Sequence, residues 1–229
     1  MEKIIKLRKI LSREKIDGYL IPKNNEFFSE YVPNCDDRLN YISNFSGSYG
    51  FSLVLKKRNY LFIDGRYTLQ AKKQSGDFFK IITFPKHMPS DILKSKKYLI
   101  GFDPKLFTNN ILTAFFGKGL KLKPLKNNLV DQIWKRRIKK SKQKFYNLPY
   151  KSLVDNYQSK INKVISVIRK TGADFQFITS SENNAWLLNI RGGDVNYSPI
   201  PHCYILIDNL KNINFFCDMS KISKSLSLM

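Results

Sequence analysis

Residues 4–22 read IIKLRKILSREKIDGYLIP, and residues 161–178 read INKVISVIRKTGADFQFI. In each stretch apolar residues recur at i, i+3 and i+7, which is the spacing of an amphipathic helix, and the short apolar run that follows predicts a strand. Four positions keep one offset of 157 residues, namely Ile4/Ile161, Leu7/Val164, Leu11/Ile168 and Asp17/Asp174. The chain therefore contains an internal repeat whose first elements are a helix and a strand.

The repeat continues beyond this first strand. Residues 41–47 (YISNFSG) align with residues 186–192 (WLLNIRG) at an offset of 145, and both segments predict a short helix that ends at a glycine. Two pairs of β-rich runs follow and predict two antiparallel hairpins, at 51–55 with 60–64 and at 204–207 with 214–218. The order helix, strand, helix, strand, strand thus occurs twice, and it predicts two related α/β domains.

The two copies differ in length. After Asp64 the sequence predicts further elements in the first copy: a helix at 67–74, strands at 78–84 and 98–102, a helix at 109–116 and a strand at 120–125. After Asp218 only eleven residues remain in the second copy. We expect the second domain to be incomplete, with an unpaired sheet edge and an uncovered apolar face, and we interpret the chain as a fragment of a longer protein.

These patterns divide the chain into a first domain at 1–134, a basic linker at 135–154 and a second, shorter domain at 155–229. The linker begins with a run, residues 135–144, in which seven of ten side chains are basic. Such a run is typical of a solvated linker that repels itself and stays extended. A nucleic-acid or targeting patch is the alternative interpretation.

The composition supports a folded protein. The 229 residues are 42% apolar and 14% aromatic, which is enough to bury a core. A net charge of +22 raises the question of an anionic partner such as nucleic acid. The longest apolar stretch, residues 203–207, is far shorter than the roughly 20 residues of a membrane span. With no secretory signal and three scattered cysteines, we expect a cytoplasmic protein with no membrane association.

Sequence templates for catalysis fail in this chain. It has no GxxxxGK[ST] phosphate loop, no HExxH and no GxSxG. Neither His87 nor His202 has a second histidine or a carboxylate at helix-face spacing, so we predict no metal ligands. Cys203 adjoins His202, but neighbours on a strand face opposite ways, and we expect a buried structural thiol. We predict no catalytic residue.

One candidate binding residue remains, in the segment Asp64-Gly65-Arg66-Tyr67 between a predicted strand and a predicted helix. Asp64 is expected to cap the helix, Gly65 to permit the tight turn, and Arg66 to project from it. A guanidinium is a planar fork that suits a carboxylate or a peptide carbonyl. The second copy keeps the aspartate, as Asp218, but has no arginine after it. The alternative is a surface arginine that only pairs with a nearby carboxylate.

Five segments in order resemble the N-terminal part of the long, three-domain form of Xaa-Pro aminopeptidase (aminopeptidase P), from near residue 3 to about residue 218. They are Ser29-Glu30-Tyr31-Val32-Pro33, Tyr41-Ile42-Ser43-Asn44-Phe45-Ser46-Gly47-Ser48, Asp64-Gly65-Arg66-Tyr67, Asn128-Leu129-Val130-Asp131-Gln132-Ile133-Trp134 and Ala185-Trp186-Leu187-Leu188-Asn189-Ile190-Arg191-Gly192. The resemblance implies two tandem creatinase-type N-terminal domains, each a mixed β-sheet flanked by helices. It also implies that Arg66 contacts a proline-containing peptide substrate.

In that family a separate catalytic domain carries the ligands of two metal ions, usually manganese. The resemblance therefore implies that this chain binds no cofactor, is inactive alone, and contributes substrate contact and assembly surface. Its implied partners are the missing catalytic domain and the peptide, and the sequence leaves a homodimer open. The alternative functions are a free-standing basic nucleic-acid-binding module, against which the absence of any recognised nucleic-acid motif argues, and a regulatory paralogue without catalysis.

Overall fold

The computed structural model describes residues 2–93, 97–117, 119–223 and 226. It divides into two compact units, each built from two stretches of the chain. Unit 1 comprises Met1–Glu26 and Asp36–Ile138, and unit 2 comprises Phe27–Cys35 and Lys139–Met229. The segment 27–35 thus belongs to unit 2, where the Phe27 ring stacks on His202 with 4.2 Å between ring centroids.

Unit 1 is built on a six-stranded sheet with the order β4-β3-β2-β1-β5-β6. In chain order the strands are β1 (Gly18–Pro22), β2 (Gly50–Leu55), β3 (Asn59–Asp64), β4 (Lys80–Phe84), β5 (Leu99–Phe102) and β6 (Lys121–Pro124). The central strands β1, β2 and β3 pair antiparallel, whereas β4, β5 and β6 join as parallel neighbours. The predicted mixed sheet and the 51–64 hairpin are confirmed.

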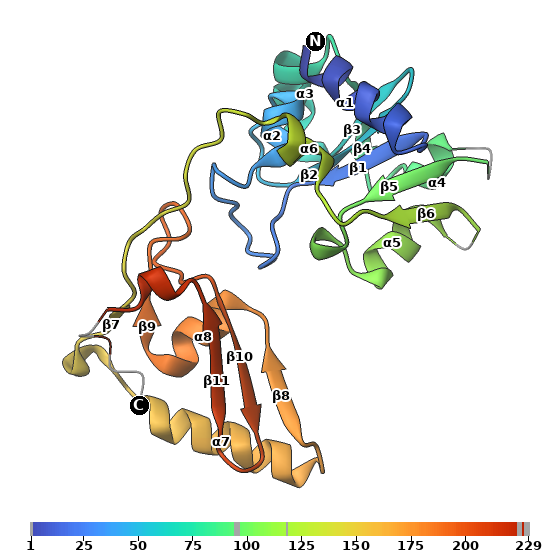
Figure 1. Ribbon diagram of the computed structural model, residues 1–229. Coiled ribbons are helices and arrows are strands. Elements are labelled where there is room, and N and C mark those ends of the chain that lie inside the picture. The colour runs from blue at the N-terminus through green and yellow to red at the C-terminus, as the bar shows by residue number, and fades with distance from the viewer. Residues whose placement is uncertain (1, 94–96, 118, 224–225, 227–229) are drawn as a thin grey trace. The chain divides into compact units, whose positions relative to one another are not determined.

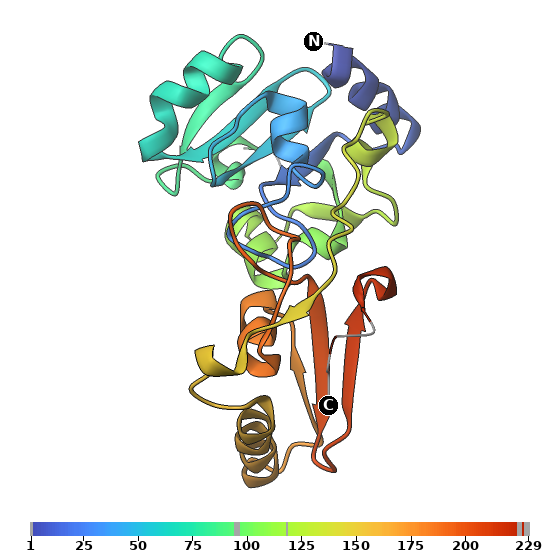
Figure 2. The ribbon, with the colours of Figure 1, turned by 90° about the vertical axis from the view of Figure 1, so that its left-hand side faces the viewer.

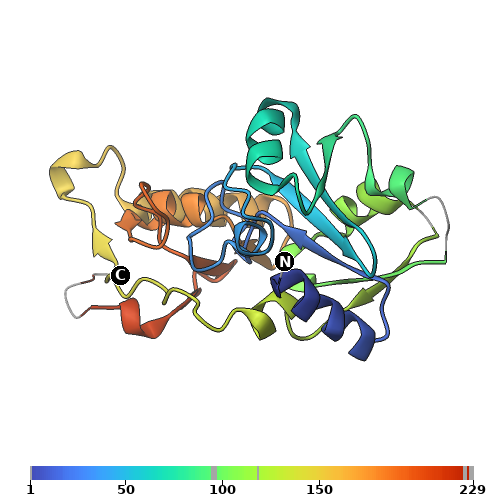
Figure 3. The ribbon, with the colours of Figure 1, turned by 90° about the horizontal axis from the view of Figure 1, so that it is seen from above.

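Helices cover both faces of this sheet, as Figure 1 shows. One face carries α1 (Glu2–Arg13), α2 (Arg38–Ser43), α3 (Thr68–Ser75) and α6 (Leu129–Ile133), and the other carries α4 (Pro89–Ile92) and α5 (Asn109–Phe116). Figure 3 shows the same unit from above, with α1 in dark blue and α3 in teal. Burial on both faces explains why β1 and β2 are buried along their whole length. The sequence patterns missed α4 and α6.

Unit 2 has a smaller sheet with the order β11-β10-β8. Its elements are β7 (Tyr146–Asn147), α7 (Tyr157–Lys170), β8 (Phe175–Ile178), α8 (Ser181–Leu188), β9 (Ile190–Arg191), β10 (Cys203–Asp208) and β11 (Ile213–Cys217). The three strands pair antiparallel, and β7 pairs separately with β9. Figure 2 shows α7 and α8 on one face of the three-stranded sheet. The predicted 204–218 hairpin is confirmed.

The repeat offsets align the elements of the two units. β8, β10 and β11 take the places of β1, β2 and β3, while α7 and α8 take those of α1 and α2. In the described residues of unit 2 no strand corresponds to β4, β5 or β6, so β8 has β10 as its single neighbour where β1 has two. The described strands of unit 2 are all antiparallel, because the counterparts of the parallel strands of unit 1 are not among them.

The second helix of each copy ends earlier than predicted. α2 ends at Ser43 and α8 at Leu188, and the capping residues that follow, Asn44 and Asn189, adopt left-handed backbone angles, with φ of 63° and 56°. The expected glycines, Gly47 and Gly192, lie three residues further along the chain. Asparagine tolerates this conformation better than most residues with a side chain, so it ends the helix in place of glycine.

Part of the range 135–154, expected to be a basic linker, packs in unit 2. Phe145 is buried in the unit 2 core, and its backbone N–H donates to the Lys221 carbonyl at 2.9 Å. At the start of the range, Arg137 belongs to unit 1 and pairs with Asp36 at 2.5 Å and with Asp131 at 3.1 Å. The range 135–154 therefore includes residues that are held by each unit.

Hydrogen exchange should distinguish the two hairpins. β3 lies between β2 and β4, whereas β11 is an edge strand in the part of the chain that the structure describes. We expect the amides of residues 213–217 to exchange faster than those of residues 59–64, because edge amides that face away from the sheet lack a strand partner. Mass spectrometry of peptides from the exchanged protein measures this. Equal protection of both strands would contradict an open edge in unit 2.

Candidate functional site

The candidate site is the turn between β3 and α3. The Asp64 side chain accepts a hydrogen bond from the Arg66 backbone N–H at 2.9 Å and thereby caps the 3-10 turn Gly65–Tyr67, which leads directly into α3. The predicted cap is confirmed. A short carboxylate suits this position because it satisfies a backbone N–H that the first helical turn leaves unpaired.

Arg66 lies on the surface of this turn, and its side chain is 77% exposed. Its Nε donates to Asp64 Oδ1 at 2.9 Å, and Nη2 donates to Asp64 Oδ2 at 3.3 Å. These hydrogen bonds lower the pKa of Asp64 and raise the pKa of Arg66. The alternative interpretation, a surface arginine that pairs with a nearby carboxylate, thus describes the present contact of Arg66. An exposed ion pair of this kind contributes little free energy, so it leaves Arg66 available to a further partner.

Aromatic and hydroxyl groups fix the neighbourhood of Arg66. Its guanidinium lies over the Tyr67 ring, 5.8 Å from the ring centroid. The Tyr67 hydroxyl shares a hydrogen bond of 2.7 Å with Ser48, and its ring meets Phe45 edge to face. Phe45 is fully buried, so Tyr67 is anchored to the core of unit 1 beside the exposed guanidinium.

The role expected for Gly65 is wrong. Its backbone φ is not in the left-handed region, and an added Cβ would meet only Thr83 Cγ2, at the ordinary contact distance of 3.7 Å. The turn therefore requires no conformational freedom special to glycine.

Unit 2 repeats the turn without the arginine. The Asp218 side chain accepts from the Ser220 N–H at 2.9 Å and caps the 3-10 turn Met219–Lys221. Ser220 occupies the place of Arg66. The capped turn is therefore a property of the repeated fold, while the guanidinium is particular to unit 1.

The histidines and cysteines form no metal site in the described part of the chain, where no group of three or more His, Cys, Asp or Glu side chains could hold a metal ion. Cys203 is fully buried, and burial raises its thiol pKa to about 12, which confirms the expected buried thiol. His202 is also buried and stacks on Phe27, while its backbone N–H donates to Asp194 at 2.8 Å. His87 is exposed.

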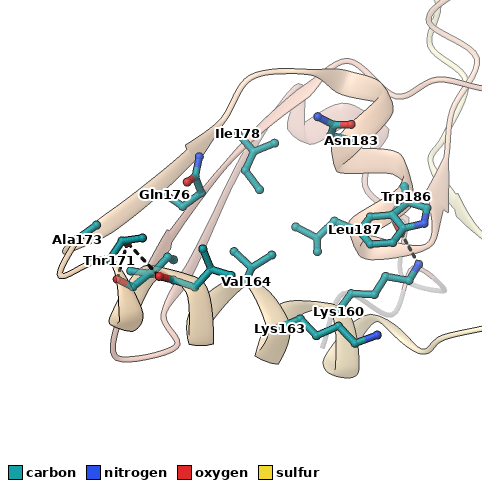
Figure 4. Close-up of a pocket in the computed structure, with 12 residues that line it drawn as sticks. Lys160, Lys163, Val164, Thr171, Ala173, Gln176, Ile178, Asn183, Trp186 and Leu187 are labelled. Atoms are coloured by element: carbon teal, nitrogen blue, oxygen red, sulfur yellow. Dashed lines mark hydrogen bonds between the residues drawn. The ribbon is translucent and has the colours of Figure 1, made fainter.

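The sequence patterns missed a groove in unit 2. It has a volume of about 530 Å³ and lies between α7, α8 and the end of β8. Val164, Ile178 and Leu187 point into it, and Trp186 closes one end (Figure 4). A signal was present, since Val164, Val167 and Thr171 form a stripe at helical spacing beside the one that builds the core.

Among the described residues, no helix is long and apolar enough to cross a membrane.

Substitutions at the turn should separate its structural residue from its exposed one. Asp64→Ala removes the cap and should lower the free energy of unfolding by about 1 kcal/mol. Arg66→Ala should change it by less than about 0.5 kcal/mol, because the side chain is exposed and its ion pair is screened by water. Urea titration of both variants measures the difference. An Arg66→Ala protein as unstable as Asp64→Ala would mean that the arginine holds the turn.

Comparison with known proteins identifies the fold. A family model described as the creatinase/prolidase N-terminal domain matches residues 3–133, and a second model with the same description matches residues 136–228. A probable Xaa-Pro aminopeptidase P from Laccaria bicolor is 29% identical over 96% of this chain and 36% of its own length. Aminopeptidase P2 of Arabidopsis thaliana is 32% identical over 97% of this chain and 33% of its own length.

A solved structure agrees with these matches. An X-prolyl aminopeptidase from Caenorhabditis elegans, described as a cytosolic enzyme with a di-nuclear active site, is 27% identical and superposes with a TM-score of 0.90 over 97% of this chain and 39% of that one. The chain spans about a third of the length of the curated relatives it matches. With two matching models that together cover nearly all its residues, the chain belongs to the creatinase/prolidase N-terminal domain family.

Proposed function

We propose that the chain is the N-terminal, non-catalytic portion of a metal-dependent Xaa-Pro aminopeptidase, an enzyme that removes an N-terminal residue preceding proline. The observation that carries the proposal is the similarity, along nearly the whole chain, to X-prolyl aminopeptidases of which it spans little more than a third. In the complete enzyme this portion contributes a substrate contact and assembly surface. We also propose a cytoplasmic location and leave homodimerisation as one mode of assembly.

Arg66 is the residue proposed to contact the peptide substrate. A guanidinium has five N–H donors, and Asp64 accepts from Nε and from one N–H of Nη2. In the described part of the chain, the remaining three donors have no protein partner. A peptide carbonyl or carboxylate can therefore bind Arg66 without displacing Asp64, and Asp64 then holds the guanidinium plane in place.

The catalytic metal ions of such an enzyme do not fit this chain. The described residues offer no cluster of metal-ligating side chains, so none of them is assigned a role at a metal centre. We propose that a separate catalytic domain holds two metal ions, usually manganese in this family, and that the present chain acts on the peptide by binding alone.

The nucleic-acid-binding alternative is less well supported. The basic run that motivates it is partly engaged within the protein, since Arg137 pairs with two aspartates and Lys144 donates to the Ser220 carbonyl at 2.5 Å. Neither family model describes a nucleic-acid-binding domain.

The first test concerns the isolated chain. Residues 1–229, incubated with an Xaa-Pro peptide and excess Mn²⁺, should release no N-terminal residue above a metal-free blank, because two-metal hydrolysis needs several ligands to bind the ions and activate water. Release in a preparation free of contaminating peptidase would overturn the assignment of a non-catalytic portion.

The second test concerns Arg66 in an active enzyme. Residues 1–229 can replace the corresponding segment of the C. elegans relative, and the Arg66→Ala chimera should lose about ten- to a hundredfold in kcat/KM, the loss expected for one charge-assisted hydrogen bond. Arg66→Lys should recover little, because a point charge does not replace the planar fork. Arg58→Ala, at the exposed β2–β3 turn, is the matched control. An unchanged kcat/KM for Arg66→Ala would remove the proposed role.

A further inference from the structure

Three neighbouring strands of unit 1, β2, β3 and β4, place their ends beside the candidate turn (Figure 1). Gly50 at the start of β2 lies opposite Ile63, and Phe84 at the end of β4 lies opposite Asp64. Because β2 is antiparallel to β3 and β4 is parallel to it, the start of β2 and the end of β4 meet where β3 ends. Tyr49, the residue before β2, therefore stands next to the turn.

Hydrogen bonds hold the loop that leads to Tyr49. The Ser46 backbone N–H donates to Gln74 Oε1 at 3.0 Å, and Gln74 Nε2 donates to the Ser46 hydroxyl at 2.9 Å. Two residues further on, the Ser48 hydroxyl shares its hydrogen bond with the Tyr67 hydroxyl. The residue after Tyr49 is already paired in the sheet. The backbone of Tyr49 is thus fixed on both sides, so a ligand that contacts the ring pays little ordering entropy there.

The Tyr49 ring lies on the surface, 47% exposed, against the Phe84 ring with 6.1 Å between centroids. Phe84 meets Phe51 edge to face in the second core cluster, so the surface ring rests on buried ones. Burial and the negative charge of Asp64 raise the pKa of Tyr49. The Tyr49 hydroxyl is therefore close to the carboxylate that holds Arg66, and it stays protonated at neutral pH.

Unit 2 provides an internal comparison. His202 stands in the place of Tyr49, because in both units the next residue pairs with the residue before the capping aspartate. His202 is buried and stacks on Phe27, and Ser220 stands in the place of Arg66. The exposed ring and the arginine thus occur together in unit 1, and unit 2 has neither. The repeated fold does not require this pair.

Two chemistries lie side by side on this surface. Arg66 offers N–H donors to a carbonyl or carboxylate, and Tyr49 with Phe84 offers aromatic carbon to an apolar group. A peptide residue carries the same two chemistries, an oxygen of its backbone and a side chain. One residue of a peptide can therefore contact both.

The chemistry of the proposed reaction selects that residue in a tripeptide Xaa-Pro-Yaa. The carbonyl of Xaa belongs to the bond that is cleaved, so it must lie in the separate catalytic domain. The proline carbonyl and the C-terminal carboxylate remain as partners of Arg66. Yaa adjoins both groups, because it is linked to the first and bears the second.

We propose that Tyr49 is a specificity-determining residue whose ring contacts the side chain that follows proline, while Arg66 binds the neighbouring carbonyl or carboxylate. The enzyme then prefers an aromatic or long aliphatic residue after proline to glycine, which has no side chain to place on the ring. The inference rests on the proposed function, since it adds a side-chain contact to the proposed backbone contact of Arg66.

The test uses the chimera that carries residues 1–229 in the C. elegans relative, assayed with the tripeptides Ala-Pro-Gly, Ala-Pro-Leu and Ala-Pro-Phe. The readout is the ratio of kcat/KM for Ala-Pro-Phe to kcat/KM for Ala-Pro-Gly within one preparation. Any loss of folded protein cancels in this ratio. Tyr49→Ala should lower the ratio about three- to tenfold, the effect of one aromatic contact, and Ala-Pro-Leu should follow Ala-Pro-Phe.

Further variants separate the ring from its hydroxyl and from its position. Tyr49→Phe keeps the ring and should keep the ratio, whereas Tyr49→Gln, which has no ring, should lower it as Tyr49→Ala does. Phe78→Ala is the matched control, because this aromatic side chain is 40% exposed and lies before the start of β4, at the opposite end of that strand from Phe84. It should leave the ratio unchanged.

Arg66→Ala in the same assay distinguishes the two levels of the proposal. It should lower kcat/KM for all three tripeptides. If it does so while Tyr49→Ala leaves the ratio unchanged, or lowers all three activities equally, Tyr49 selects no side chain and this inference is wrong, although the substrate contact of Arg66 stands. If Arg66→Ala changes none of the three activities, the substrate contact itself is wrong and the inference is overturned with it.

Discussion

The apolar face of the paired helices α1 and α2 must be removed from water, and much of unit 1 follows from how this is done. The chain returns from the far edge of the sheet, through β6, to lay α6 across that face. Burial of Leu129, Val130 and Ile133 there removes three large apolar side chains from solvent, at roughly 1.5–3 kcal/mol each. The return requires the added strands β5 and β6, so the covering segment and the six-stranded sheet depend on each other.

Unit 2 shows what the same plan retains without that covering segment. Unit 2 keeps the helix pair, the hairpin and the aspartate-capped turn. Lys160 of its first helix also donates to the Trp186 carbonyl near the end of the second helix. Its core consists of one buried cluster on the helical side of the sheet, whereas unit 1 has one on each face. Phe175 and Phe177 of β8 remain exposed, although β1 at the equivalent place is buried. Exposure of β8 thus reflects its single strand neighbour among the described residues, where β1 has two.

The sequence predicted the elements whose residues interact locally and missed those set by tertiary packing. The periodic spacing of Ile4, Leu7 and Leu11 identified α1, and the same spacing identified α7. α6 has only five residues, too few for a periodic signal, and it is helical because α1 and α2 hold it. At the candidate site, local chemistry predicted the Asp64 cap correctly. The groove beside Trp186 was missed, because the stripe of Val164, Val167 and Thr171 indicates only an apolar helix side, and the groove forms where two helices and a strand meet in the folded unit.

The paired helices of each unit present an apolar face that is covered by α6 in unit 1 and, among the described residues, is exposed in unit 2. Acrylamide quenching of tryptophan fluorescence tests it directly, with Trp134→Phe leaving Trp186 as the reporter and Trp186→Phe leaving Trp134. We expect the exposed Trp186 to be quenched much more strongly than Trp134, which stacks on Tyr41. Equal protection of both rings in dilute protein would show that the surface of unit 2 is already covered, and would contradict the account.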